Sequence, residues 1–304
     1  MKGVFFIVGP TATGKSDLAA DAALRIDAEI VSADAFQIYK GLDLLTAKPE
    51  ASILKKVPHH LIGVVPLADE MNAELFRRKA LEAIAAIQAR GKRVVVAGGS
   101  GMYVKALTHG LSKLPPANAE LREELNALET AELEKRLVAL DPATAGTIDL
   151  KNRRRLVRAL EICMLTGQPA AAQRTSWQVE ESLNPAAGMF LWREREDLYA
   201  RIDRRVEKIF EQGVVEEVRA VTEIGTTAAG MLGLSEIRAL IEGSLSRSEC
   251  IAAIQQATRR YAKRQLTWFR RQSNLEPLNL SLLSHDAAVE RITERALVSS
   301  AIKG

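Results

Sequence analysis

A glycine-rich segment near the N-terminus has the residue types and spacing of a phosphate-binding loop. Such a loop lets backbone N–H groups converge on phosphate oxygens, and the dipole of the helix that follows adds attraction. A lysine supplies positive charge, and a hydroxyl can ligate Mg²⁺. The segment fits G-x-x-x-x-G-K-[ST] and reads Gly9, Pro10, Thr11, Ala12, Thr13, Gly14, Lys15 and Ser16. The pattern predicts phosphate binding, and a diphosphate ester presents the same oxygens as ATP.

A second candidate for chemistry is Asp34, which directly follows a short apolar segment at Ile30-Val31. Ligands of open α/β sheets bind beyond the carboxyl ends of the strands, so Asp34 is expected in the same crevice as the phosphate loop. Taken alone, a capping or turn role is favoured for Asp34 over a catalytic one. A third apolar segment, 93–97, ends in Gly98-Gly99 without an acidic residue. P-loop NTPases commonly hold magnesium with such an acid, which argues against a hydrolytic motor or a simple kinase.

The elements that position these residues alternate between strand and helix. Val4–Val8 is a continuous apolar run, typical of a strand buried on both faces. Residues 73–90 have helical periodicity and are followed by Gly91, which fits a C-cap. Gly188–Trp192 has the pattern of a returning strand. The alternation predicts an α/β fold with a P-loop NTPase-like parallel sheet.

The pattern changes after Pro115-Pro116, where leucine stripes at helical spacing replace the apolar strands. We therefore predict a P-loop core in residues 1–114 and a helical insertion in 115–185. Residues 186–304 return to the core. Helices are expected to fill this part after the strand at 188–192, and the last long helix is expected at 247–271.

Two groups of basic residues stand out from a nearly balanced composition, in which 42 Lys and Arg face 38 Asp and Glu. Arg154, Arg155 and Arg158 share one side of a predicted helix. A second group, 259–271, interleaves arginine and lysine with aromatic residues. Guanidinium groups neutralise phosphates and aromatic rings stack on unpaired bases, although a solvated helix face would look the same. For the pair His59-His60 a structural role is favoured over catalysis.

The remaining composition points to a cytoplasmic protein. The two cysteines form no C-x-x-C pair and no zinc spacing, which indicates a reduced, intracellular setting. The apolar run at the N-terminus is too short for a secretory signal, and no segment reaches the ~18 apolar residues of a membrane span. We expect no membrane association and a monomer.

The chain resembles the tRNA dimethylallyltransferase (isopentenyltransferase) family. The resemblance rests on segments that occur in the family's order along almost the whole chain. They are the phosphate loop, Ser32–Tyr39, Thr46–Pro49, Pro58–Ile62, Gly98–Tyr103, Arg155–Glu161 and Lys263–Arg270.

The resemblance implies transfer of a dimethylallyl group from its diphosphate to the exocyclic amine of the adenosine 3′-adjacent to the anticodon in tRNA, with Mg²⁺ as cofactor. The phosphate loop would bind the diphosphate, Asp34 would act as general base, and Lys15 and Ser100 would assist. Ser100 stands where the family usually has threonine. The residues implied to contact tRNA are Asp34, Ala35, Phe36, Gln37, Ser100, Arg122, Arg154, Arg155, Arg158, Lys263, Arg264, Gln265, Thr267, Trp268 and Arg270.

Departures from the family pattern leave some contacts open. Ala35 replaces a usual serine, Gly63 a usual aspartate, and Leu234 a tyrosine. The alternatives are a small-molecule kinase, a prenyltransferase acting on a free adenosine nucleotide, and a non-catalytic RNA-binding protein. The basic groups and the helical insertion favour tRNA over a small acceptor.

Overall fold

The chain forms two compact units. The computed structural model describes residues 3–111, 114–170, 172, 187–272 and 275–301. One unit is made of residues 1–108 and 183–304, and the other of residues 109–182. The insertion predicted at 115–185 compares with this second unit, and residues 173–186 lie outside the described residues.

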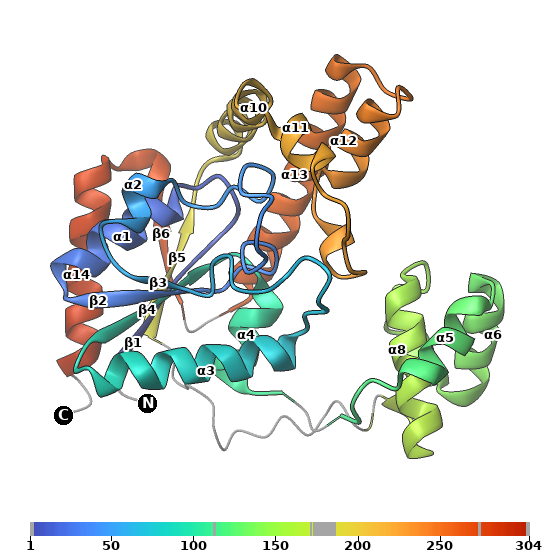
Figure 1. Cartoon of the computed structure of the whole chain (residues 1–304). Coiled ribbons are helices and arrows are strands. Elements are labelled where there is room, and N and C mark those ends of the chain that lie inside the picture. Colours follow the sequence, from blue (N-terminus) through green and yellow to red (C-terminus); the bar gives the residue numbers. More distant parts are fainter. Residues whose placement is uncertain (1–2, 112–113, 171, 173–186, 273–274, 302–304) are drawn as a thin grey trace. The chain divides into compact units, whose positions relative to one another are not determined.

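The first unit is built on a parallel sheet of six strands in the order β3-β2-β4-β1-β5-β6 (Figure 1). The phosphate loop follows β1, Asp34 follows β2 and Ser100 follows β4, so all three lie at the carboxyl edge of neighbouring strands. The predicted α/β parallel sheet is confirmed. The strands are β1 (Val4–Val8), β2 (Ala28–Ser32), β3 (His59–His60), β4 (Arg93–Gly98), β5 (Ala187–Trp192) and β6 (Glu276–Asn279).

Both faces of the sheet are covered, because successive side chains of a strand point to opposite sides. Phe5 and Ile7 of β1 pack into one apolar cluster with α1 and α14, while Phe6 and Val8 pack into the other. That second cluster includes residues of α3, α4 and α10 to α13. The helices of this unit are α1 (Lys15–Arg25), α2 (Ala51–Leu54), α3 (Ala73–Ala89), α4 (Gly101–His109), α10 (Arg195–Glu211), α11 (Val214–Arg219), α12 (Leu234–Ile241), α13 (Arg247–Arg270) and α14 (His285–Ala301).

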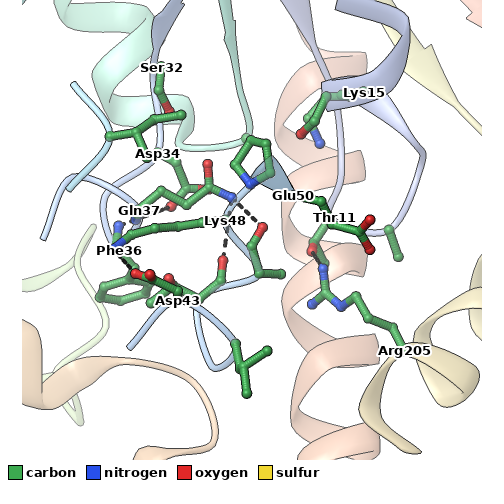
Figure 2. A pocket seen from close by; sticks show the side chains of 18 of the residues that line it. Thr11, Lys15, Ser32, Asp34, Phe36, Gln37, Asp43, Lys48, Glu50 and Arg205 are labelled. Atoms are coloured by element: carbon green, nitrogen blue, oxygen red, sulfur yellow. Dashed lines mark hydrogen bonds and ion pairs between the residues drawn. The ribbon is translucent and has the colours of Figure 1, made fainter. Parts of the chain in front are cut away.

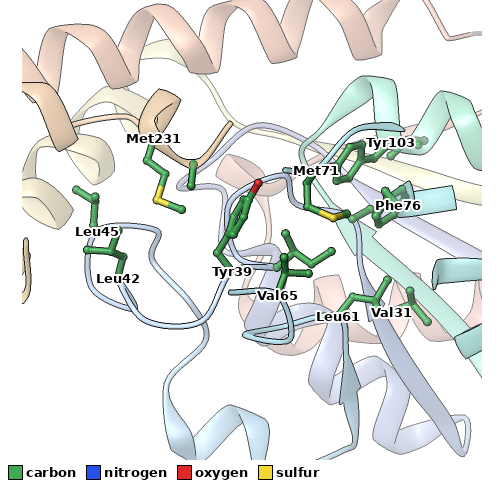
Figure 3. Packing of buried hydrophobic residues seen from close by; sticks show 14 of the residues in the cluster. Val31, Tyr39, Leu42, Leu45, Leu61, Val65, Met71, Phe76, Tyr103 and Met231 are labelled. Atoms are coloured by element: carbon green, nitrogen blue, oxygen red, sulfur yellow. The ribbon is translucent and has the colours of Figure 1, made fainter. Parts of the chain in front are cut away.

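The irregular segment after β2 is anchored in the core rather than free at the surface. Its residues Tyr39 and Leu42 are almost fully buried, and they belong to the same cluster as Phe76, Tyr103 and Met231 (Figure 3). The carboxylate of Glu217 in α11 accepts hydrogen bonds from the backbone N–H groups of Leu44 and Leu45, at 2.9 and 3.0 Å. The segment that begins at Asp34 is thereby anchored at Tyr39 and Leu42 and again at Leu44 and Leu45.

The sequence predicted the central strands and missed both edge strands. β3 has only two residues, His59 and His60, and β6 contains Pro277. The expectation that helices fill the chain after β5 is therefore wrong at 276–279. Proline cannot donate to a strand ladder, so its presence at the sheet edge is what sheet geometry allows. The predicted helix at 247–271 corresponds closely to α13, but it is not the last long helix, because α14 follows it at His285–Ala301.

The second unit is a small bundle with its own apolar core. Leu125, Leu133, Leu137 and Leu156 are buried together there. Glu161 of the last helix is also buried, and its carboxylate is bonded by Arg122, Arg158 and the backbone N–H of Asn118. The helices are α5 (Ala119–Ala127), α6 (Thr130–Leu140), α7 (Pro142–Ala145) and α8 (Arg153–Thr166).

We expect Glu161→Gln to loosen the second unit by about 2 kcal/mol, because the neutral amide keeps only one acceptor oxygen and no longer gives charge-assisted hydrogen bonds to both arginines. Hydrogen–deuterium exchange of peptides within 119–166 should show the lower opening free energy. Glu132→Gln, which breaks the exposed pair with Arg136 in the same unit, is the control and should change exchange little. Equal exchange in the two variants would contradict a structural role for Glu161.

Candidate active site

The phosphate loop is held by its carbonyl groups. Gly14 precedes α1 in a left-handed conformation, with φ 91°. The Arg193 side chain donates to the carbonyl of Thr13 at 2.9 Å, and Arg201 donates to that of Ala12 at 2.8 Å. Within the described part of the chain, no hydrogen bond occupies the N–H groups of Ala12, Thr13 or Gly14. The loop is thus fixed from outside with these donors left for an anion.

Lys15 at the first position of α1 is half-buried, and its ammonium donates to the carbonyl of Pro10 at 2.6 Å. Burial lowers the pKa of Lys15 to about 8; the negative charge of Asp34 opposes this shift and the positive charge of Arg205 adds to it. A cation with so low a pKa is poorly solvated. It would gain strongly from an anion placed in the loop.

Asp34 divides its two carboxylate oxygens between the fold and the cavity. Its Oδ1 accepts hydrogen bonds from the backbone N–H groups of Phe36, at 2.9 Å, and Gln37, at 3.2 Å. No hydrogen bond to Oδ2 occurs among the described residues. The turn role weighed from the sequence is therefore real, and it orients the side chain without consuming the oxygen that could take a proton.

Ser100 joins the loop after β4 to the loop after β2. Its N–H donates to the carbonyl of Ala33 at 3.2 Å, and its hydroxyl oxygen accepts from the N–H of Ala35 at 2.9 Å. Burial and then the charge of Asp34 raise the pKa of Tyr261, and a hydrogen bond with Ser100 opposes this shift. Ser100 and Tyr261 therefore both lie in the immediate surroundings of Asp34.

Lys15, Asp34 and Tyr261 line one cavity of about 1660 Å³, whereas Ser100 lies behind its wall and contacts the lining residue Tyr261. Figure 2 shows Lys15, Asp34, Gln37 and Arg205 at its wall, on elements far apart in the sequence. The predicted Gln37 donates through its side-chain amide to the carbonyl of Ala47 at 2.8 Å, so it also holds the segment after β2.

Three arginines at this site were missed by the sequence reasoning: Arg193, Arg201 and Arg205. The Arg205 guanidinium donates to the Thr11 hydroxyl at 2.8 Å. Burial lowers its pKa, and Asp34 opposes the shift. A signal was present, because Arg201 and Arg205 lie four residues apart beside the apolar stripe of α10 and so face the protein rather than solvent.

The basic group at 259–271 divides between two faces of α13. Lys263, Arg264, Thr267 and Arg270 are exposed. Gln265 instead lies on the buried stripe, bonded to both the phosphate loop and the loop after β4. Trp268 packs so closely on Gly101 that a Cβ there would lie 2.6 Å from the indole ring.

In the second unit Arg154 and Arg155 are exposed, whereas Arg122 and Arg158 are both paired with the buried Glu161. These four arginines of the second unit therefore differ in what already holds them. Of the four, only the exposed pair has no carboxylate partner among the described residues and can neutralise a backbone phosphate without losing one.

The three departures from the family pattern are accommodated locally. Ala35 contributes its backbone N–H, which any residue supplies. Gly63 has a φ of 63°, and a Cβ there would lie 3.7 Å from Nζ of Lys48, which pairs with Asp43 instead. Leu234 is buried in the core beneath the site.

The missing acidic residue after β4 has a steric cause. A Cβ on Gly98 would lie 2.2 Å from the carbonyl oxygen of Ala33. No side chain fits at this point while β4 runs beside the loop after β2.

Within the described ranges, no cluster of three or more His, Cys, Asp or Glu residues could bind a metal ion. No helix among those residues is long and apolar enough to span a membrane.

Comparison with known proteins agrees with this geometry. A family model described as IPP transferase matches residues 37–272. The chain is 43% identical to tRNA dimethylallyltransferase 1 of Citrifermentans bemidjiense over 276 residues, which is 90% of each chain. It is 40% identical to the tRNA dimethylallyltransferase of Akkermansia muciniphila, covering 95% of this chain and 98% of that one.

Solved structures give the same result. The tRNA isopentenylpyrophosphate transferase of Bacillus halodurans aligns with a TM-score of 0.71 and 31% identity over 100% of this chain and 99% of that chain. A eukaryotic dimethylallyltransferase described as acting on tRNA aligns with a TM-score of 0.75 and 25% identity, over 92% of this chain and 74% of that chain.

The fold and the site define a P-loop-like prenyltransferase acting in tRNA modification. The chain belongs to the tRNA dimethylallyltransferase family, and the kinase and non-catalytic alternatives are wrong.

We expect binding of dimethylallyl diphosphate to weaken as the pH rises above about 8, the pKa of Lys15. Below that pH the ammonium is already charged in the free enzyme. Above it, the neutral amine must first take up a proton, so Kd should rise by up to about tenfold per pH unit. Calorimetric titration without tRNA measures this, and Lys15→Ala should bind weakly without the break near pH 8. A break that persists in Lys15→Ala would assign the titration to another group.

Proposed function

We propose that this enzyme transfers the dimethylallyl group of dimethylallyl diphosphate to the exocyclic amine of the adenosine 3′-adjacent to the anticodon, and releases diphosphate. The observation that carries the proposal is the opening of the phosphate loop and of Asp34 into the same cavity. A diphosphate bound in the loop brings its ester carbon towards the carboxylate of Asp34. A protein that only binds phosphate does not require a carboxylate at this place.

In the reaction, the adenine nitrogen forms a bond to the allylic carbon while the bond from that carbon to the diphosphate oxygen breaks. The amine lone pair is delocalised into the ring and is a weak nucleophile. Asp34 Oδ2 takes the proton that the amine loses as the new bond forms. Oδ1 remains bonded to the backbone and holds the carboxylate in place.

The departing diphosphate gains negative charge on its bridging oxygen. Lys15, the N–H groups of Ala12 to Gly14 and the nearby Arg205 are fixed before the reaction, so they stabilise this charge without reorganising. Ser100 Oγ accepts from Ala35 N–H, and the Ser100 hydroxyl is also hydrogen-bonded to Tyr261, which lines the cavity, so Ser100 would act by holding Ala35 and Tyr261 around Asp34.

Magnesium fits this donor set. Ser16 places a hydroxyl at the cavity wall, and Mg²⁺ prefers few protein ligands, several waters and substrate phosphate oxygens. When bound, the ion would neutralise diphosphate charge. Ser16 would orient the ion, and Lys15 would act on the terminal phosphate.

The tRNA side of the proposal rests on the exposed cations. Lys263, Arg264 and Arg270 on α13, together with Arg154 and Arg155 on α8, can neutralise backbone phosphates. The adenine must leave its stack to reach a cavity of this depth. We further propose that the enzyme acts as a cytoplasmic monomer.

We predict that Asp34→Asn lowers the single-turnover rate by roughly 10² to 10⁴, the usual contribution of a positioned acid–base group. Asparagine retains an oxygen for the N–H groups of Phe36 and Gln37, so the fold should survive. Single-turnover transfer from labelled dimethylallyl diphosphate to unmodified tRNA, followed by nucleoside analysis, measures the rate.

Asp43→Asn is the matched control, since it removes another carboxylate of the same cavity wall. It should leave the rate within a few-fold of wild type. A folded Asp34→Asn variant with a near-normal rate would exclude Asp34 as the base. ATP should not be consumed in any reaction.

We predict that the double change Arg154→Gln, Arg155→Gln weakens tRNA binding and flattens its salt dependence. For each backbone phosphate that is no longer neutralised, the slope of log K against log salt should become shallower by about 0.7 to 0.9. Arg136→Gln, another exposed arginine of the second unit, is the control. A slope equal to that of the control would show that Arg154 and Arg155 face only solvent.

A further inference from the structure

Gln265 of α13 makes two long-range hydrogen bonds to loops of the proposed site. Its Oε1 accepts from the backbone N–H of Thr11 at 2.9 Å, and its Nε2 donates to the carbonyl of Gly99 at 2.8 Å. The side chain is 7% exposed. Each end of the amide therefore has one partner inside the protein, which fixes its orientation.

The two partners of Gln265 belong to the two halves of the proposed reaction. Thr11 lies in the phosphate loop, which holds the leaving group. Gly99 immediately precedes Ser100, whose hydroxyl holds the backbone of Ala35 beside Asp34. The Gln265 amide thus joins the loop that binds diphosphate to the loops that carry the base.

The close approach of this amide explains the bare backbone at Gly99. A Cβ on Gly99 would lie 2.4 Å from Nε2 of Gln265, closer than real Cβ atoms approach. Gly99 also lies beside the phosphate loop, since the same Cβ would lie 3.1 Å from the carbonyl oxygen of Gly9. The loops already meet through one backbone bond, from Gly9 N–H to the carbonyl of Gly98 at 3.3 Å. Gln265 adds the second point of attachment, and two points fix an orientation that one cannot.

We propose that Gln265 is a positioning residue, which sets the distance and angle between the bound diphosphate and the Asp34–Ser100 pair. This proposal rests on the proposed function and replaces the tRNA contact expected from the sequence. Small errors in the approach of two reacting groups are costly, and a misplacement of about 1 Å can lower a rate by about 10²-fold. Loss of the bridge should therefore appear in kcat rather than in the affinity for either substrate.

Gln265→Glu tests the proposal, because its two protonation states differ in the bond that matters. The carboxylate can still accept from Thr11 N–H, but it cannot donate to the Gly99 carbonyl. The protonated acid can do both and has nearly the shape of glutamine. We expect a single-turnover rate about 10²-fold below wild type at pH 8. The ratio of variant to wild-type rate should rise as the pH falls and the carboxyl is protonated.

Two further variants keep the test decisive. Gln265→Met preserves the length of the side chain and removes both hydrogen bonds, so its defect should be similar in size and independent of pH. Gln256→Glu adds the same charge to an exposed position of the same helix, and it should match wild type at every pH. For Gln265→Met and Gln256→Glu, Kd for dimethylallyl diphosphate and for tRNA should stay within a few-fold of wild type. The carboxylate of Gln265→Glu also repels the diphosphate, so its rate is measured at saturating dimethylallyl diphosphate and compared with that of Gln265→Met.

Other outcomes overturn the proposal in recognisable ways. Weaker tRNA binding with a normal single-turnover rate at saturating tRNA would return Gln265 to a tRNA contact. A lower melting temperature with a normal rate at all pH values would make it a structural residue only. If the wild-type enzyme itself forms no dimethylallyladenosine, the proposed function fails, whereas an active wild type with a normal Gln265→Glu variant refutes the positioning role alone.

Discussion

The site depends on fixing the backbone of the phosphate loop while its N–H groups stay free. A loop of this kind has many polar groups and little apolar surface, so it needs partners to hold one conformation. Here the carbonyls of Ala12 and Thr13 are bonded by Arg201 and Arg193. The arginines come from the part of the chain that returns after the second unit. The anion site is therefore complete only when the segments before and after the second unit have packed together.

The same constraint explains what the amino-acid sequence revealed about the site. The phosphate loop, Asp34 and Ser100 are set by short segments at strand ends, so local patterns were sufficient to find them. Arg201, Arg205 and the inward face of Gln265 depend on which side of α10 and α13 packs on the sheet. Periodicity places these residues beside a buried stripe, but only the tertiary packing determines what the stripe covers.

The fold divides in a similar way. The central strands β1, β2, β4 and β5 are apolar on both faces, which made them visible in the sequence, as did the long amphipathic α13. The edge strands β3 and β6 are short and bury less apolar surface, so the chain carries little local signal for them. Among the basic residues, Arg122 and Arg158 could not be separated from Arg154 and Arg155 without knowledge of the buried Glu161. The spacing of three residues between Arg158 and Glu161 on α8 does not show whether the carboxylate of Glu161 points into the unit or towards solvent.

The contact between Gly98 and Ala33 has a consequence for how this fold can diversify. The end of β4 is a natural place for the acidic residue that would let a P-loop protein hydrolyse nucleotides. Here that place is occupied by the backbone of the neighbouring strand's loop. Gaining the acid would require β4 and β2 to separate, which would also move Asp34. A single substitution at position 98 therefore cannot supply the acid while the base stays in place. At this position the packing of two backbones, rather than the choice of side chain, excludes the acid.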